Sequence, residues 1–187
     1  MSFKATVTRP QTMVEGLFAL EPQITILVKQ VSDALAKGNK VLFFGNGGSA
    51  SDAQHLAAEF VVRYKEHRKP YAAIALTTDT SILTAHGNDY DFSTLFDRQI
   101  EALAKPGDVA IGLSTSGNSD NVINGFKIAK EIGCWTCAFT GQSGGQLLTQ
   151  ADSCIQVPSQ ETARVQEGHI IIGHWLCEAL DLQIDAV

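Results

Sequence analysis

Two short apolar runs, each ending in a glycine- and serine-rich turn, constrain the fold of this chain more than any other feature. The first run, at residues 41–44, leads into Gly45–Ser49, and the second, at residues 109–113, leads into Ser114–Ser119. Runs of this length between turn residues are typical of buried strands. Both turns precede a helical pattern, and ligands of open α/β sheets bind at the carboxyl ends of the strands. The pair therefore predicts two phosphate-binding turns at one edge of a parallel sheet.

The whole chain alternates between helix and strand patterns. Strands are predicted at 41–44, 72–76, 109–113, 134–139 and 153–157, and helices at 50–63, 80–85, 92–104, 120–131, 145–149 and 162–183. Ahead of the first strand, apolar residues at helical spacing are interrupted at Glu21-Pro22 and end near Gly38, which predicts two helices or one broken helix. We expect an α/β fold, a three-layer αβα sandwich around a five-stranded parallel sheet. At 187 residues the chain fits one domain, with residues 1–38 packing on it or on a neighbouring subunit.

Composition narrows the class of protein. The net charge of -6 and a pI near 5.3 provide no basic surface for nucleic acid or for an anionic membrane. No apolar stretch approaches the roughly 20 residues that span a bilayer, and the N-terminal residues lack the apolar core of a secretory signal. We expect a cytoplasmic enzyme that acts on a small metabolite.

The four cysteines do not form a disulfide scaffold in a chain of this size. Cys134 and Cys137 have the spacing of a redox pair, but they lie in a predicted strand. Residues three apart on a strand point to opposite faces, so these two sulfurs are not expected to pair.

Two groups of polar residues have the spacing of a site. His55 and Glu59 are four residues apart and share a helix face, where they could hold a divalent metal ion or form an ordinary exposed polar pair. In the second turn, backbone amides and clustered hydroxyl groups could bind a phosphate monoester or merely cap a helix. The first turn has neither the lysine of a nucleotide P-loop nor an acidic ribose ligand after the next strand, so ATP and nicotinamide cofactors are not favoured.

The remaining charged and histidine positions receive simpler interpretations. The predicted final helix holds Gln166, Glu167, His169 and His174 among apolar residues, so these polar side chains need partners in a site or a subunit interface. We interpret His169 as a core or interface residue. His67 and His86 are expected in loops, and the charged run 63–69 is expected to be a solvated connection.

Taken together and in order, these motifs resemble the phosphoheptose isomerases of the sugar isomerase (SIS) fold. The residues that carry the resemblance are Asn46-Gly47-Gly48-Ser49, Asp52, His55, Glu59, Gly87-Asn88-Asp89, Ser114–Ser119, Gln166-Glu167 and His174. The resemblance implies a flavodoxin-like sheet and an aldose–ketose isomerase that converts sedoheptulose 7-phosphate to a heptose 7-phosphate, which feeds ADP-heptose and lipopolysaccharide synthesis. It also implies a homotetramer with active sites between subunits.

The same resemblance implies roles for individual residues. Glu59 and His174 would be catalytic, and zinc would be held by His55, Glu59, Gln166 and His174. Substrate contacts would come from Asn46, Gly47, Gly48, Ser49, Glu59, Asn88, Asp89, Ser114, Thr115, Ser116, Ser119 and Gln166. The roles of Glu59 as base and as metal ligand compete, because a carboxylate bound to a metal is not a free base.

Two questions stay open at this stage. Gln166 and His174 are about 12 Å apart along an ideal helix. Either the helix starts after Gln166, the two side chains act in different subunits, or Gln166 binds substrate and not metal. Some relatives of this fold bind a replication-initiator partner or sense a sugar phosphate without catalysis, and the presence of both Glu59 and His174 argues against these alternatives.

Overall fold

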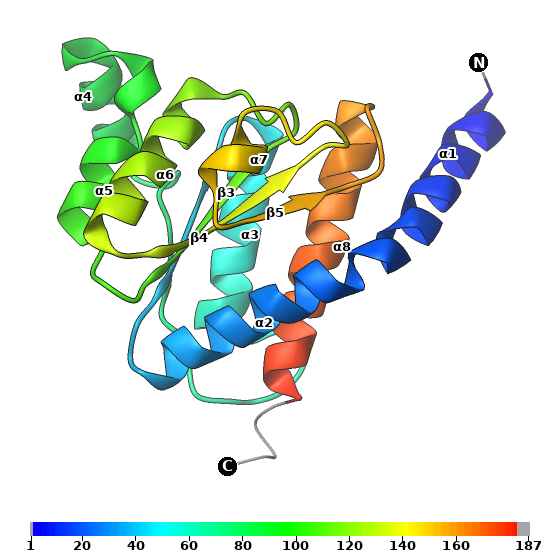
Figure 1. Ribbon diagram of the computed structural model, residues 1–187, viewed down its shortest axis with the longest axis horizontal. Coiled ribbons are helices and arrows are strands. Elements are labelled where there is room, and N and C mark those ends of the chain that lie inside the picture. Colours follow the sequence, from blue (N-terminus) through cyan, green and yellow to red (C-terminus); the bar gives the residue numbers. More distant parts are fainter. Residues whose placement is uncertain (1, 183–187) are drawn as a thin grey trace.

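The computed structural model describes residues 2–182 and shows a parallel sheet between two layers of helices (Figure 1). The strands are β1 (Val41–Gly45), β2 (Ala73–Ala75), β3 (Val109–Ser114), β4 (Trp135–Thr140) and β5 (Ser153–Gln156). The helices are α1 (Phe3–Gly16), α2 (Glu21–Ala36), α3 (Gly48–Val61), α4 (Thr80–Asp89), α5 (Asp97–Leu103), α6 (Asp120–Ile132), α7 (Leu147–Gln150) and α8 (Thr162–Asp181). Short 3-10 turns, η1 (Leu17–Leu20) and η2 (Phe92–Thr94), precede α2 and α5.

The strand order is β2-β1-β3-β4-β5, with every pair parallel, as the alternation of patterns predicts. The chain leaves β1 toward β2 on one side and leaves β3 toward β4 on the other. The direction of winding therefore changes between β1 and β3, and such a switch point opens a crevice at the carboxyl ends of the two strands. Both glycine- and serine-rich turns follow these two strands.

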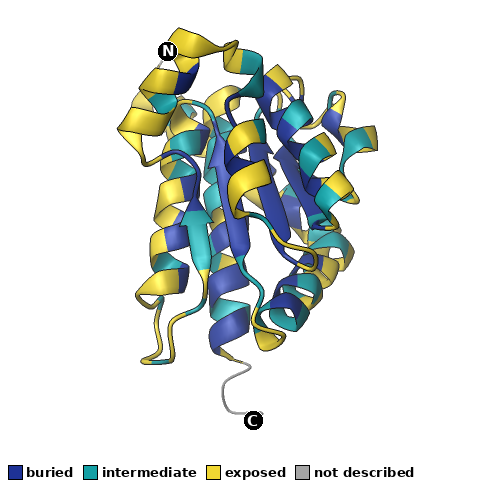
Figure 2. Ribbon diagram, turned by 90° about the vertical axis from the view of Figure 1, so that its left-hand side faces the viewer, coloured by how far each residue is buried: buried dark blue, intermediate teal, exposed yellow. Residues whose placement is uncertain are grey.

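Alternate residues of the strands point into two separate cores. Val41 and Phe43 belong to the core beneath α2, α3 and α8, whereas Leu42 and Phe44 belong to the core beneath α5 and α6. Figure 2 shows the buried strands between helices whose outer faces are exposed. Cys134 and Cys137 lie in different cores, and both are free thiols, which confirms that they do not pair.

The N-terminal helices pack along α8 of the same chain. The predicted interruption at Glu21-Pro22 is present, because η1 separates α1 from α2 and Pro22 occupies the first turn of α2, where a missing amide hydrogen costs nothing. Met13 and Leu17 are buried against the core, while Phe18 is 79% exposed. No helix among residues 2–182 combines the length and apolar character needed to cross a bilayer.

Most predicted boundaries agree with the structure to within a few residues. The predicted helix 80–85 continues to Asp89, and the predicted helix 92–104 is divided into η2 and α5. Residue 183, at the end of the predicted final helix, lies outside the described residues.

Candidate active site

The two turns after β1 and β3 are joined by a pair of amide side chains. Asn46 Nδ2 donates to Asn121 Oδ1 at 2.8 Å, and Asn121 Nδ2 donates back to Asn46 Oδ1 at 2.9 Å. Asn121 lies in the first turn of α6 and is 2% exposed. The reciprocal pair fixes the first turn against the start of the helix that follows the second. Asn121 could not be selected from the sequence, because an asparagine near a helix start gives no signal of burial.

The first turn brings the backbone close to α8. Gly47 has a φ of +56°, a conformation that favours glycine, and α3 begins at the next residue. A Cβ on Gly48 would lie 2.9 Å from Gln166 Cδ and closer still to Gln166 Nε2, so the Gln166 side chain lies directly against this turn. Ser49 is buried beneath it.

The position of Gln166 answers one of the questions left by the sequence. Because α8 begins at Thr162, the helix does not start after Gln166, and that alternative is wrong. Gln166 and His174 are therefore two turns apart on one helix, with Gln166 beside the first turn and His174 beside His55. Two alternatives remain: either Gln166 binds substrate and not metal, or Gln166 and His174 act in different subunits.

The second turn gathers three hydroxyl groups. Ser114 Oγ lies 2.9 Å from Ser119 Oγ and 3.5 Å from Ser116 Oγ. Gly117 has a φ of +68°, and a Cβ there would collide with the Gly144 backbone. Ser119 is the N-cap residue of α6, yet its side chain makes no capping hydrogen bond. The simple capping role therefore does not explain this serine, and the hydroxyl cluster lies at a helix N-terminus that suits an anion.

His55, Glu59 and His174 lie together where α3 crosses α8. His55 Nε2 is 3.4 Å from Glu59 Oε1 and 2.9 Å from His174 Nε2. Burial lowers the pKa of His174, the neighbouring His55 lowers it further, and Glu59 opposes the shift. A neutral His174 can share one proton with His55, since each ring nitrogen either donates or accepts. The His55–Glu59 pair is thus part of a three-residue group and not an isolated surface pair.

Tyr64 completes this group from the loop after α3. Its ring stacks on His174, with centroids 5.5 Å apart and an interplanar angle of 26°. The His174 ring therefore contacts two rings, Tyr64 by stacking and His55, whose centroid lies 5.0 Å away, at a tilt of 51°. Tyr64 could not be selected from the sequence, because an aromatic residue in a charged loop has many possible contacts.

The three side chains are of types that bind zinc, but the two histidine nitrogens lie slightly too close together. Two histidine nitrogens bound to one tetrahedral zinc at 2.0–2.1 Å stand about 3.3 Å apart, whereas those of His55 and His174 are 2.9 Å apart. Among residues 2–182, no three His, Cys, Asp or Glu side chains are already arranged around a point that a metal ion could occupy. The donor types fit zinc, and a displacement of a few tenths of an ångström would fit the spacing.

Asn88 and Asp89 lie far from this group within one chain. They occupy the exposed end of α4, where Asn88 Nδ2 donates to Asp89 Oδ1 at 2.8 Å. Figure 1 shows α4 at the upper left, away from α8, although Leu83 of α4 lines a cavity with Asn46 and Gly47 of the first turn. The structure therefore does not bring these predicted substrate contacts to His174 of the same chain.

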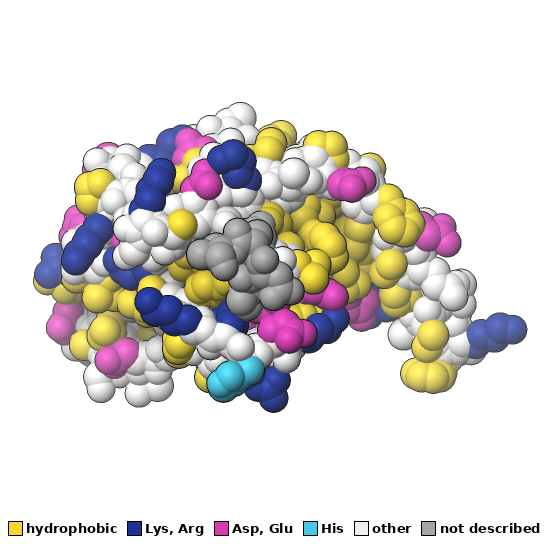
Figure 3. All heavy atoms as spheres, turned by 90° about the horizontal axis from the view of Figure 1, so that it is seen from below, with side chains coloured by type: hydrophobic (Ala, Val, Ile, Leu, Met, Phe, Trp, Pro, Cys, Tyr) yellow, Lys and Arg dark blue, Asp and Glu magenta, His cyan; other side chains and the backbone are white. Residues whose placement is uncertain are grey.

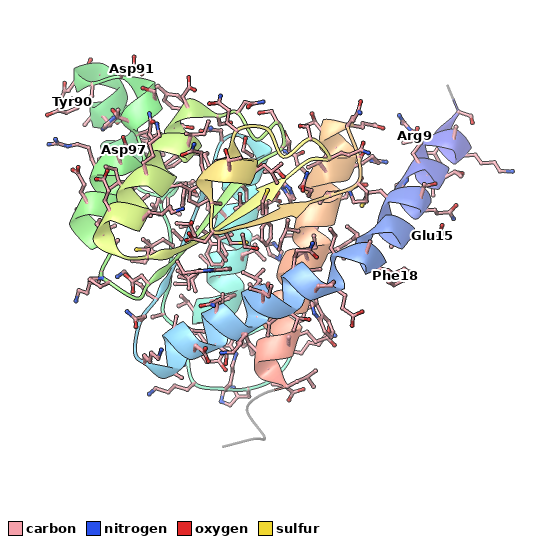
Figure 4. All side chains as sticks on the ribbon, viewed as in Figure 1. Arg9, Glu15, Phe18, Tyr90, Asp91 and Asp97 are labelled. Atoms are coloured by element: carbon pink, nitrogen blue, oxygen red, sulfur yellow. The ribbon has the colours of Figure 1, made fainter. Side chains whose placement is uncertain are left out.

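His86 is the clearest error of the sequence analysis among the histidines. It lies inside α4, not in a loop, and is 6% exposed. Its Nε2 is within hydrogen-bond distance of Asp91 O at 3.1 Å and Thr94 Oγ1 at 3.0 Å, and its ring stacks on Tyr90. Figure 4 shows Tyr90 and Asp91 at this end of the molecule. These contacts join α4 to η2, which a linear pattern does not reveal.

The other two histidines outside the group lie as expected. His67 is in the exposed loop between α3 and β2. His169 is fully buried, its Nε2 lies 3.2 Å from Thr140 O, and burial lowers its pKa to about 4. It is a core residue, as predicted.

Comparison with known proteins identifies the family that the sequence motifs resemble. The SIS domain family matches residues 10–141. The chain is 60% identical over 159 residues to the phosphoheptose isomerase of Aquifex aeolicus, covering 85% of this chain and 83% of that protein. It is 54% identical to the phosphoheptose isomerase of Geotalea daltonii, covering 97% and 95% of the two chains. The solved phosphoheptose isomerase of Neisseria gonorrhoeae superposes with a TM-score of 0.91 at 40% identity, covering 96% of each chain. The chain therefore belongs to the phosphoheptose isomerases of the SIS family.

Proposed function

We propose that this protein is an aldose–ketose isomerase that converts sedoheptulose 7-phosphate to D-glycero-D-manno-heptose 7-phosphate, the first step of ADP-heptose synthesis for lipopolysaccharide. The observation that carries the proposal is the group formed by Glu59, His55 and His174 at the α3–α8 crossing. The relatives named as phosphoheptose isomerases support it. A non-catalytic protein that binds a replication-initiator partner or senses a sugar phosphate is not favoured, since both proposed catalytic side chains are present and adjacent.

The reaction moves a proton between C1 and C2 of the sugar through an enediol, which needs a base and a proton donor to oxygen. Glu59 has a side chain that is 25% exposed at the edge of the group, so its carboxylate can reach a bound substrate and act as the base. His174, kept neutral by its lowered pKa, can exchange a proton with a sugar oxygen and with His55. The three residues thus provide a base for the carbon-bound proton and a donor for the proton on the sugar oxygen.

Substrate would lie along the crevice between the two turns. The phosphate group suits the hydroxyls of Ser114, Ser116 and Ser119 and the N-terminus of α6, with Thr115 beside them. Asn46, Gly47, Gly48 and Gln166 line the path from there toward Glu59. We assign Asn88 and Asp89 to the site of a neighbouring subunit, because they occupy the exposed end of α4, away from α8 of their own chain.

We also propose that His55, Glu59 and His174 can hold zinc, in alternation with the proton transfer above because a metal-bound carboxylate or ring nitrogen is not free to exchange a proton, while Gln166 contacts substrate. Bound zinc would polarise the carbonyl and hydroxyl oxygens of the sugar. The donor types support this assignment, and Gln166 is the weakest candidate ligand, because its side chain lies against Gly48, two helical turns from His174.

A homotetramer in the cytoplasm completes the proposal. A groove of about 430 Å³ runs between α8 and the start of α2, and its lining includes Phe18, Ile171 and Trp175, which are 79%, 41% and 48% exposed. Figure 3 shows hydrophobic side chains gathered between the N-terminal helix at its right-hand end and the rest of the molecule. Apolar surface of this kind suits a second copy of the chain. Four free thiols suit a reducing compartment.

The activity is tested with zinc-supplemented protein and sedoheptulose 7-phosphate, following the aldose product. Glu59→Gln removes the base with little change of shape and should lower kcat by on the order of 100-fold or more. Glu131→Gln, an exposed change on α6, is the matched control and should keep the parent rate. A parent that binds the sugar phosphate without turnover would contradict the proposed activity and favour a sensor.

The shared site is tested by mixing two inactive variants. Glu59→Gln and Asp89→Asn, co-expressed with different tags and purified as mixed oligomers, should regain activity in about a quarter of the sites, where both native residues meet. Mixed oligomers as inactive as the separate variants would show that both residues come from the same chain.

A further inference from the structure

The loop after α3, expected to be solvated, contains a buried ion pair. Arg68 Nε donates to Asp181 Oδ1 at 2.7 Å, and the two side chains are only 2% and 3% exposed. Asp181 Oδ2 accepts the backbone amides of Lys65 and Glu66 at 3.0 and 3.1 Å. Burial opposes ionisation of Asp181, but the hydrogen bonds from Arg68 and from these amides leave its pKa below the usual value. The end of α8 therefore anchors the loop through an ionised carboxylate.

The same guanidinium group also holds the last turn of α3. Arg68 Nη2 donates to Glu59 O at 2.8 Å, and Nη1 donates to Phe60 O at 2.9 Å. The final carbonyl groups of a helix lack partners within the helix, and a positive charge there is favourable. One arginine thus connects the backbone of the proposed base, Glu59, to the carboxylate at the end of α8.

The anchored loop also reaches the proposed acid. Asp181 binds the amides of residues 65 and 66, and Tyr64, immediately before them, stacks on the His174 ring. The loop backbone therefore sets where the Tyr64 ring lies. Glu59 and His174, which come from different helices, are both connected to the Arg68–Asp181 pair, the first through its carbonyl and the second through Tyr64.

We propose that Arg68 and Asp181 are positioning residues that keep Glu59 and His174 at the relative position that proton transfer requires. The inference rests on the proposed isomerase function. Neither side chain reaches the surface of the site, so they act through the backbone of α3 and through Tyr64. A displacement of about 1 Å at a reacting group can lower a rate on the order of 100-fold, so even a small relaxation of the pair has a measurable effect.

Arg68→Lys keeps the positive charge, but one ammonium group cannot reproduce the forked donors that serve Asp181 and two carbonyls together. Asp181→Asn keeps the shape of the carboxylate and removes its charge. Tyr64→Leu removes the ring that stacks on His174, a ring that also packs against the core and lies beneath Lys65 Nζ. The matched control is Glu178→Gln, which breaks the exposed Lys65–Glu178 pair, 2.8 Å apart, between the same loop and the same helix.

Each variant is measured by its folded fraction, by kcat per folded subunit and by the Kd of the heptitol 7-phosphate, which binds but cannot isomerise. We expect kcat to fall by about tenfold or more in the three test variants, while Kd stays within about threefold, because the phosphate turn lies on other elements. In metal-free protein, the imidazole NMR signals of His174 should shift in Arg68→Lys and Asp181→Asn and not in Glu178→Gln. Tyr64→Leu is judged by kcat, because loss of the stacked ring moves these signals in any case.

Folded Arg68→Lys and Tyr64→Leu proteins with kcat within about twofold of Glu178→Gln, together with unshifted His174 signals in Arg68→Lys, would overturn the inference. These two variants decide the matter even if Asp181→Asn does not fold. An inactive parent would instead contradict the proposed isomerase function, and the NMR comparison would still test the positioning.

Discussion

Replacing Gly173 by alanine tests whether the spacing of α3 and α8 sets the geometry of the catalytic group. A Cβ on Gly173 would lie 2.8 Å from Leu56 Cδ1 and 3.1 Å from Leu56 Cγ, and nearer still to Cδ2. Ordinary carbon–carbon contacts are about 3.5–4.0 Å, so the overlap is roughly 0.7 Å or more. Leu56 is 1% exposed and cannot turn away into solvent, so the two helices must separate.

The consequence for stability is small, and the consequence for activity is large. Overpacking of a core costs about 1–3 kcal/mol, and alanine regains about 1 kcal/mol over glycine inside a helix, which leaves a net loss of about 0–2 kcal/mol in the free energy of unfolding. Leu56 and Gly173 adjoin His55 and His174 in sequence, so the separation occurs beside the catalytic group. A shift approaching 1 Å should lower kcat by about 10- to 100-fold.

The measurements are urea denaturation and kcat per folded subunit. The control is Gly125→Ala on α6, where a Cβ would lie 3.1 Å from Ile100 Cδ1 and 3.2 Å from Phe44 Cε2, in the core on the other face of the sheet. It should change kcat by less than about threefold. A Gly173→Ala protein that is folded and has the kcat of the control would refute the idea that this helix crossing sets the catalytic geometry.

Three further outcomes follow from contacts near the site and in the core. Gly48→Ala displaces only the flexible end of Gln166, so the free energy of unfolding should change by less than about 1 kcal/mol while kcat/KM falls about tenfold, and adding Gln166→Ala should lower it no further. Asn121→Ala leaves the Asn46 amide without its two hydrogen bonds, so urea denaturation should report a loss of about 1–3 kcal/mol and KM should rise. The unfolded chain protonates His169 below pH 6.5, whereas the folded protein does so only near pH 4, so stability should fall by about 3 kcal/mol as the pH falls between these values. Replacing His169 by leucine should flatten that part of the pH profile, and an unchanged slope would contradict the assignment.

The sheet and its order follow from local signals that the sequence contains. Strands β1 and β3 are uniformly buried, and each ends at a turn that contains a glycine of positive φ. An apolar run bounded by such turns has few alternatives, since parallel strands are buried on both faces. Helix starts and ends were predicted less well in the segment from Thr80 to Leu103, where α4, η2 and α5 follow one another closely.

Burial of polar side chains was the part that the sequence could not predict. His86, Arg68 and Asn121 were expected to be exposed or were not selected, yet each is buried. Their partners are backbone carbonyls, a carboxylate and an amide that other segments bring to them. A buried polar group is stable only when it is hydrogen-bonded, and whether a bonding group arrives depends on tertiary packing and not on local periodicity.

The catalytic group shows why a motif on one helix is an incomplete prediction. His55 and Glu59 at four-residue spacing would look the same on any exposed helix face. What distinguishes them is His174, 119 residues later in the chain, whose ring nitrogen lies 2.9 Å from His55. That approach depends on Gly173, which lets α8 lie close to Leu56, and on Tyr64, whose ring stacks on His174. A histidine–carboxylate pair therefore becomes a candidate site when a third polar group is held against it by residues that have no chemical role of their own.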